Sequence, residues 1–218
     1  MRYTLWTLCF ALLATSLIAC DPGTDDPIDP ELTASAEEAI EFVDDELAAE
    51  GLERDLSLLD NDRLIDEVRR IAEFAEAHGC DVVGALGGIY LPDPTLEGGT
   101  FNGRWIKRDR SIGGDLHGSY TPDPTDPGED VDAGEMEPAG TFVGEWDASD
   151  GQYGDLGGDY YRFEEGRGAF LGRYAATDSD ANGMLGGLWY DLDRDGGVFF
   201  GVWGHCGDDA VEIEPESY

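Results

Sequence analysis

The sequence predicts a mainly β fold: an eight-stranded antiparallel up-and-down barrel preceded by two short α-helices. Three observations lead to this prediction. A Gly/aromatic segment recurs eight times after residue 80, alternate residues within each copy share a character, and one cysteine stands at each end of the repeated region. The alternative is a strongly curled meander sheet with open edges.

The chain begins with a short apolar segment behind a positive charge. Arg2 precedes the apolar run 5–19, which is shorter than the ~20 residues that span a bilayer and has the length of a signal-peptide core. The run ends in LIAC, Leu17 to Cys20, which resembles the lipobox of bacterial lipoproteins. The resemblance implies that residues 1–19 are a signal peptide and that the Cys20 thiol receives a diacylglycerol. It also implies a further acyl chain, such as palmitate, on the freed amine, and two or three chains anchor a protein firmly.

These features predict a lipoprotein of the bacterial cell envelope, held on the exported side of the inner or the outer membrane. Removing residues 1–19 takes away one of the 13 basic residues and none of the 49 acidic ones, so the formal net charge changes from −36 to −37. Such a chain repels nucleic acid and anionic lipid. We therefore expect no nucleic-acid partner, and a membrane contact made through the lipid on Cys20.

The stretch that follows the lipidated cysteine is acidic and rich in proline. Residues 20–32 show no apolar periodicity, which predicts an extended tether. A helical leader is predicted over 33–79. In its first helix Ser35 and Glu38 have capping-box spacing. The apolar positions Ile40, Val43 and Leu47 share one face of this helix.

The second predicted helix runs from Asp60 to about His78, and Gly79 supplies its stop. Its apolar residues fall on one stripe, as expected for a helix that packs on something else. They are Leu64, Ile65, Val68, Ile71, Ala72 and Ala75.

The predicted β domain covers residues 80–208 and is followed by an acidic tail at 209–218. The pattern Gly-x-(Leu or Phe)-x-Gly-x-(Tyr or Trp) starts at Gly84, Gly99, Gly114, Gly140, Gly154, Gly168, Gly183 and Gly197. Successive copies start 14 or 15 residues apart, apart from one interval of 26 that contains an acidic, Pro-rich loop at 121–139. This spacing leaves room for one strand and a short turn, the rhythm of an antiparallel meander.

The motif also suggests a register. Laid antiparallel against itself, it sets one large side chain opposite one glycine in every facing pair, so that rings lie on the neighbouring backbone. In a closed barrel the same register sets Gly84 opposite Trp203 and leaves Cys80 and Cys206 one residue from direct opposition, which a bulge can absorb.

The four cysteines are then all assigned. Cys9 leaves with the signal peptide and Cys20 carries lipid, so Cys80 and Cys206 remain as a pair in an oxidising compartment. We predict a disulfide between them that closes the barrel.

The inward face carries sixteen large side chains, which predicts a packed core, while the outward face is expected to be mostly hydrated. The alternative is an aromatic ligand pocket. The strand segments resemble those of avidin-type barrels, which implies such a pocket, and they loosely resemble MORN repeats.

Two loops contain the opening of a calcium-binding loop. Asp178, Asp180 and Asn182 form one set, and Asp191, Asp193 and Asp195 form the other. Their twelfth positions are Trp189 and Val202 in place of the bidentate glutamate, so Asp-rich hairpin turns are the favoured interpretation. Weak calcium binding is the alternative, and no other cofactor is predicted.

The sequence contains no nucleophile elbow, zinc-protease helix or phosphate loop. We therefore predict a protein without catalytic activity, a structural or protein-interaction module of the envelope with another envelope protein as its partner. The alternative is a β-barrel lipoprotein that binds a small ligand or calcium.

Overall fold

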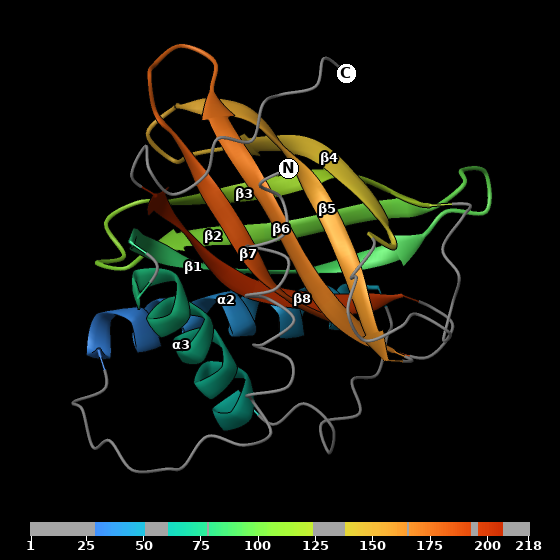
Figure 1. Ribbon diagram of the computed structural model, residues 1–218, viewed down its shortest axis with the longest axis horizontal. Coiled ribbons are helices and arrows are strands. Elements are labelled where there is room, and N and C mark those ends of the chain that lie inside the picture. The colour runs from blue at the N-terminus through green and yellow to red at the C-terminus, as the bar shows by residue number, and fades with distance from the viewer. Residues whose placement is uncertain are drawn as a thin grey trace, which may run out of the picture.

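The computed structural model describes residues 29–50, 61–77, 79–123, 138–164, 166–192 and 196–206. In these ranges the fold is mainly β, with eight antiparallel strands closed into one barrel and two helices before it in the chain (Figure 1). Each strand pairs with its sequence neighbours and the last pairs with the first, which is consistent with an up-and-down barrel. The predicted closed barrel is confirmed and the open sheet is excluded. The signal peptide, Cys20 and most of the tether lie outside the described residues.

The helices are α2 (Pro30–Ala49) and α3 (Asn61–Ala77); α2 is longer than predicted, whereas α3 matches its predicted bounds within one residue at each end. The strands are β1 (Cys80–Pro92), β2 (Gly99–Lys107), β3 (Gly113–Pro122), β4 (Gly140–Asp147), β5 (Tyr153–Glu164), β6 (Arg167–Ala176), β7 (Asn182–Asp191) and β8 (Gly197–Cys206). Neither described helix has both the length and the apolar character that crossing a bilayer requires.

Helix α2 starts earlier than the sequence analysis expected. Its N-cap is Asp29, whose Oδ1 accepts hydrogen bonds from the backbone N–H groups of Glu31 at 2.9 Å and Leu32 at 3.2 Å. Pro30 occupies the first helical turn, where its missing N–H costs nothing. The predicted cap at Ser35 is wrong: this residue is buried inside the helix and its hydroxyl donates to the Leu32 carbonyl. An Asp-Pro pair in an acidic stretch is a helix start here.

The predicted register holds at every second seam of the barrel. Between β2 and β3, for example, Phe101 faces Gly118 and Trp105 faces Gly114. The β4–β5, β6–β7 and β8–β1 seams follow the same rule.

The other four seams are shifted by two residues, so the uniform register is wrong. Between β1 and β2, Leu86 faces Trp105 and Gly88 faces Gly103. The seams β3–β4, β5–β6 and β7–β8 are shifted in the same sense. The physical reason is closure, since a barrel requires staggered and tilted strands and eight unshifted seams would supply no stagger.

The closing seam matches its prediction in detail. Gly84 faces Trp203, Cys80 faces Cys206, and the register shifts between Val82 and Gly84, where a bulge was expected. Cys80 is disulfide-bonded. The register makes Cys206 the residue opposite Cys80, and the predicted Cys80–Cys206 bond rests on that opposition.

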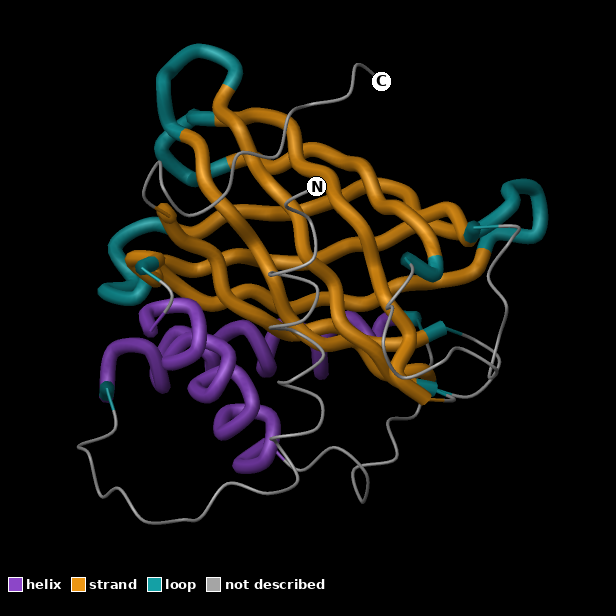
Figure 2. Tube along the Cα trace, in the orientation of Figure 1, coloured by secondary structure: helices purple, strands orange, loops and turns teal. Residues whose placement is uncertain are grey.

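The two helices cover one side of the barrel, over β1 and β8, as Figures 1 and 2 show. The outward face of these two strands is apolar and buried, in contrast to the expected hydrated face. Ala85, Ile89 and Val198 are at most 1% exposed, and they share a core with Ile40 of α2 and Val68 of α3. The described residues therefore form two large hydrophobic cores, one inside the barrel and one between its outer wall and the helices, and a small third cluster around Ala169.

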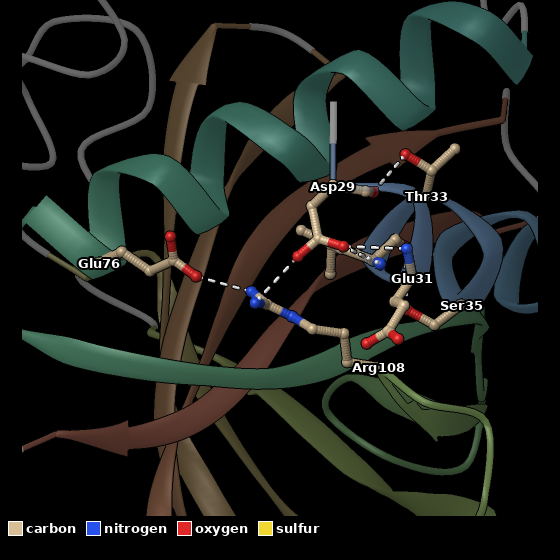
Figure 3. A network of polar contacts seen from close by, with 7 residues as sticks. Asp29, Glu31, Thr33, Ser35, Glu76 and Arg108 are labelled. Carbon is tan, nitrogen blue, oxygen red and sulfur yellow. Dashed lines mark hydrogen bonds and ion pairs between the residues drawn. The ribbon is translucent and has the colours of Figure 1, made fainter. Parts of the chain in front are cut away.

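A single arginine ties both helices to the barrel. Arg108, just after β2, places its two terminal nitrogens on different helices: Nη1 lies 3.0 Å from Oδ2 of Asp29 and Nη2 lies 2.6 Å from Oε1 of Glu76 (Figure 3). Asp29 therefore caps α2 with one carboxylate oxygen and binds Arg108 with the other. The first turn of α2, the last turn of α3 and the β2–β3 connection meet at this point.

Candidate functional site

The barrel interior is built as four layers of four side chains, each from alternate strands. Even-numbered strands supply one ring of Phe101, Phe142, Phe170 and Phe199 and another of Trp105, Trp146, Tyr174 and Trp203. Odd-numbered strands supply Leu86, Leu116, Leu156 and Leu185 in one layer and Tyr90, Tyr120, Tyr160 and Trp189 in the other. In each aromatic layer the four rings contact one another edge to face in a closed cycle, with centroids 5.0–6.3 Å apart.

The glycines of the motif make these layers possible. An added Cβ at Gly88 would lie 2.3 Å from Cζ of Phe199, and one at Gly118 would lie 2.5 Å from Cζ of Phe101. Each phenylalanine ring therefore lies against the bare backbone of a neighbouring strand. The sixteen predicted inward positions are confirmed, and the Phe and Leu layers lie in the middle of the barrel.

One cavity opens at the end of the barrel that contains the β1–β2, β3–β4, β5–β6 and β7–β8 connections. We call it the Tyr cup; it has a volume of about 240 Å³. Its walls are apolar, and its rim carries Arg162 and Asp191. The lining residues are Leu86, Tyr90, Phe101, Leu116, Tyr120, Pro122, Phe142, Leu156, Tyr160, Arg162, Phe170, Leu185, Trp189, Asp191 and Phe199.

A second cavity of about 210 Å³ opens at the opposite end, beyond the Leu layer. We call it the Trp cup. Its wall is the ring of Trp105, Trp146, Tyr174 and Trp203, and its rim includes Lys107, Asp150, Gln152 and His205. The predicted packed core is therefore too simple: a cavity opens at each end of the barrel, and both cavities reach the Leu layer.

The polar groups of the Tyr cup are held in neutral or paired forms. The Tyr90 hydroxyl donates to Oδ1 of Asp191, and burial followed by this carboxylate raises the pKa of Tyr90. Burial also raises the pKa of Tyr120, with Asp191 as the second cause. Arg162 lies 6.0 Å from the centre of the Trp189 ring, within cation–π distance. These hydroxyls stay protonated at neutral pH, which suits hydrogen bonding to a ligand and does not suit nucleophilic chemistry.

In the Trp cup the indole donors are already engaged. Nε1 of Trp105 donates to the Asp147 carbonyl at 2.9 Å, and Trp146 and Trp203 donate to carbonyls at 3.3 and 3.4 Å. The Tyr174 hydroxyl lies 3.3 Å from Nδ1 of His205. These N–H groups are already hydrogen-bonded to backbone carbonyls. The wall of the Trp cup therefore offers a ligand aromatic surface and no indole donor.

The two predicted calcium loops lie at opposite ends of the barrel, and the second is only partly described. Asp178, Asp180 and Asn182 lie at the Trp-cup end, while Asp191 lies at the Tyr-cup end, and Asp193 and Asp195 are outside the described residues. Within the described ranges no group of three His, Cys, Asp or Glu side chains is placed to hold a metal ion.

The three residues of the first set make hydrogen bonds within the protein. Asp178 accepts a hydrogen bond from Tyr153, and the Asp180 carbonyl accepts one from Nδ2 of Asn182 at 2.9 Å. These contacts are those of the Asp-rich turn that the sequence favoured. Calcium binding stays a prediction.

The residues of both rims follow the repeated motif and are not part of it. Arg162 and Asp191 stand two residues after Tyr160 and Trp189, and Lys107 and His205 stand two residues after Trp105 and Trp203. The inward period of two therefore continues past the motif. Extending that period by one step would have found all four residues.

Comparisons of this chain with protein-family models, with curated proteins and with solved structures give no match. The class of protein is therefore defined by the fold and the cups: a closed eight-stranded antiparallel barrel, with two helices on its outer wall and an aromatic cup at each end.

Proposed function

We propose that this protein is a lipid-anchored binding protein of the bacterial envelope, without catalytic activity, whose Tyr cup takes a small, largely apolar ligand. The observation that carries the proposal is the cup itself: about 240 Å³ with Phe and Leu side chains at its base and Tyr hydroxyls near its rim. An apolar cavity of ~150 Å³ holds benzene, whereas drug-sized ligands need ~300 Å³ or more. The size therefore favours a ligand of one or two rings, or the end of an acyl chain.

The rim supports a ligand with one polar group. Asp191 and Arg162 carry opposite charges, and the hydroxyls of Tyr90 and Tyr120 are neutral. An apolar body would be buried against the Phe layer while its polar group meets the rim. This arrangement gives orientation without a reactive group.

Binding can be tested with toluene and indole as probes, measured as the shift in melting temperature. A ligand that binds only the folded state at 100 times its Kd stabilises a protein by about 2.7 kcal/mol, which raises Tm by about 5–10 °C for a domain of this size. Phe142→Trp should fill the Tyr cup and remove the shift. Ala148→Val adds volume to the Trp cup instead and should keep the shift.

If neither probe shifts the melting temperature of the unsubstituted protein, this ligand proposal is wrong. That result would favour the other function expected from the sequence, a structural or protein-interaction module.

The lipid anchor has its own test. The Cys20→Ser variant should lose incorporation of labelled palmitate and leave the membrane fraction of the expressing bacterium. Retention of Cys20→Ser on the membrane would contradict the lipoprotein assignment and would leave the binding proposal untouched.

A further inference from the structure

The Trp cup is chemically different from the Tyr cup. Four aromatic side chains form its wall in a closed cycle, with centroid distances of 5.0–6.0 Å. The indole N–H groups of this ring are committed to backbone carbonyls, as described above. A ligand entering this cup therefore meets aromatic rings whose indole N–H groups are already bonded.

This surface selects among ligand classes. An anion would find no indole donor and would meet a chain of net charge −36. A neutral polar group would lose its hydrogen bonds to water without replacement from the aromatic wall. A cation with its charge spread over methyl groups gives up little hydration and is attracted to aromatic faces. The carboxylate of Asp150 on the rim adds a further attraction.

We propose that the Trp cup is a second binding site, for an organic ammonium group of the size of tetramethylammonium or choline. The volume of the cavity, about 210 Å³, is sufficient for such a group. The site lies at the other end of the barrel from the Tyr cup and does not depend on the function proposed for that cup.

One rim residue makes the proposal specific. Lys107 is the only lysine in the chain and lines the Trp cup. Its ammonium group repels a bound cation and competes with it for the aromatic wall. If the cup instead bound an anion, Lys107 would be its main attraction.

The experiment titrates the full chain with choline and with dimethylbutanol, in which carbon replaces the quaternary nitrogen, at constant ionic strength. Tryptophan fluorescence is the readout, because Trp105, Trp146 and Trp203 are three of the five tryptophans. We expect a saturable change with choline, and a Kd at least tenfold lower than that of dimethylbutanol. Equal binding of the two probes, or no saturable change with choline, would overturn the proposal.

Two substitutions, each with a matched control, make the test more specific. Lys107→Met should lower the Kd for choline severalfold, whereas Arg162→Met, at the far rim, should leave it unchanged. Trp146→Leu should raise the Kd at least fivefold, with Tyr160→Leu as the matched loss of an aromatic ring from the other cup. Weaker choline binding by Lys107→Met, a surface change that leaves the core intact, would contradict a cation site even if Trp146→Leu fails to fold.

A free cation and a lipid headgroup share this chemistry. Arg108 holds Asp29 at the same end of the barrel, nine residues after Cys20, so ~30 Å of extended chain at most separates that contact from the anchor. Flotation of Cys20→Ser protein with phosphatidylcholine vesicles distinguishes the sources. Recruitment that choline reverses indicates a headgroup, and choline binding without recruitment indicates a free ligand; both outcomes support the site.

Discussion

At the scale of single residues, the fold depends on where side chains are absent. Gly88 on β1 lies against both Phe199 and the backbone of β2, with an added Cβ 2.3 Å from Phe199 Cζ and 2.2 Å from the Asn102 carbonyl oxygen. The Phe layer therefore needs glycine at this position for space. Gly157 on β5 is a useful contrast, because its nearest atom would be 3.2 Å away.

We predict that Gly88→Ala destabilises the protein by about 1–3 kcal/mol or more, because a core this tightly packed must shift to admit a methyl group. Chemical denaturation followed by tryptophan fluorescence measures the change. Gly157→Ala is the control and should change the free energy of unfolding far less. Equal losses for both variants would show that close packing of the Phe layer is not the reason for the motif glycine.

A charged residue on the outer wall gives a prediction on pH. Burial raises the pKa of Asp159 on β5. In the unfolded state this carboxyl therefore loses its proton at a lower pH than in the folded state. The free energy of unfolding falls as the pH rises from about 4 through the folded-state pKa. Asp159→Asn should remove this cost and raise the free energy of unfolding at pH 7 by up to about 1 kcal/mol, since the group is only half-buried.

The gain from Asp159→Asn should vanish below about pH 3, where both states bind the proton. Melting curves of the two proteins across this range measure it. Asp155→Asn, at an exposed position of the same strand, is the control. A gain for Asp159→Asn that persists at low pH would mean that the carboxylate charge is not its cause.

At the scale of elements, the helices and the barrel form one unit. Small residues allow a close fit: an added Cβ at Gly87 of β1 would lie 3.3 Å from the Ala39 carbonyl oxygen of α2. The apolar face of α2 is buried over β1, and α3 contacts β1, β7 and β8. Arg108 adds the polar connection at one end of both helices.

We predict that Arg108→Ala loosens the first turn of α2 and the last turn of α3 together, at a cost of about 1–2 kcal/mol, because it removes charge-assisted hydrogen bonds from a partly buried pair of contacts. Hydrogen exchange of the two turns reads out the local effect. Arg69→Ala removes ion pairs made within α3 and should cost less than about 0.5 kcal/mol. Loosening of only one helix would show that Arg108 does not couple them.

At the scale of the whole molecule, closure removes every sheet edge. The β1–β8 seam pairs strands that are at opposite ends of the repeated region, and Cys80 faces Cys206 at its end. Backbone pairing along the rest of the seam continues from Gly84 to Tyr90. The predicted Cys80–Cys206 disulfide would therefore reinforce a seam that is also closed by the backbone.

Reduction should lower the free energy of unfolding by about 2–5 kcal/mol, because a bond across a long loop restricts the unfolded chain. The barrel should stay closed, so the far-ultraviolet circular dichroism of the folded protein should not change. Cys80→Ser should reproduce the loss without reductant and respond to reductant no further. A reductant effect that persists in Cys80→Ser would assign the stabilisation to another cause.

The local sequence pattern was sufficient to predict much of the fold. The period of two and the eightfold motif predicted the strands, their inward faces and the position of the closing bulge, because side-chain alternation is a property of a single strand. The apolar stripes of both helices were also predicted from the sequence. Cys20 as a lipidation site rests on sequence alone.

Only the tertiary structure decided how these parts combine. The two-residue shift at alternate seams follows from closing the barrel, which no single strand encodes. The outward positions Ala85 and Val198 are apolar because the helices cover them, and only the tertiary structure shows that contact. The two cups exist because rings from four different strands meet around an axis and leave the ends of the barrel unfilled. Such spaces depend on distances between strands, and a sequence read one strand at a time does not contain those distances.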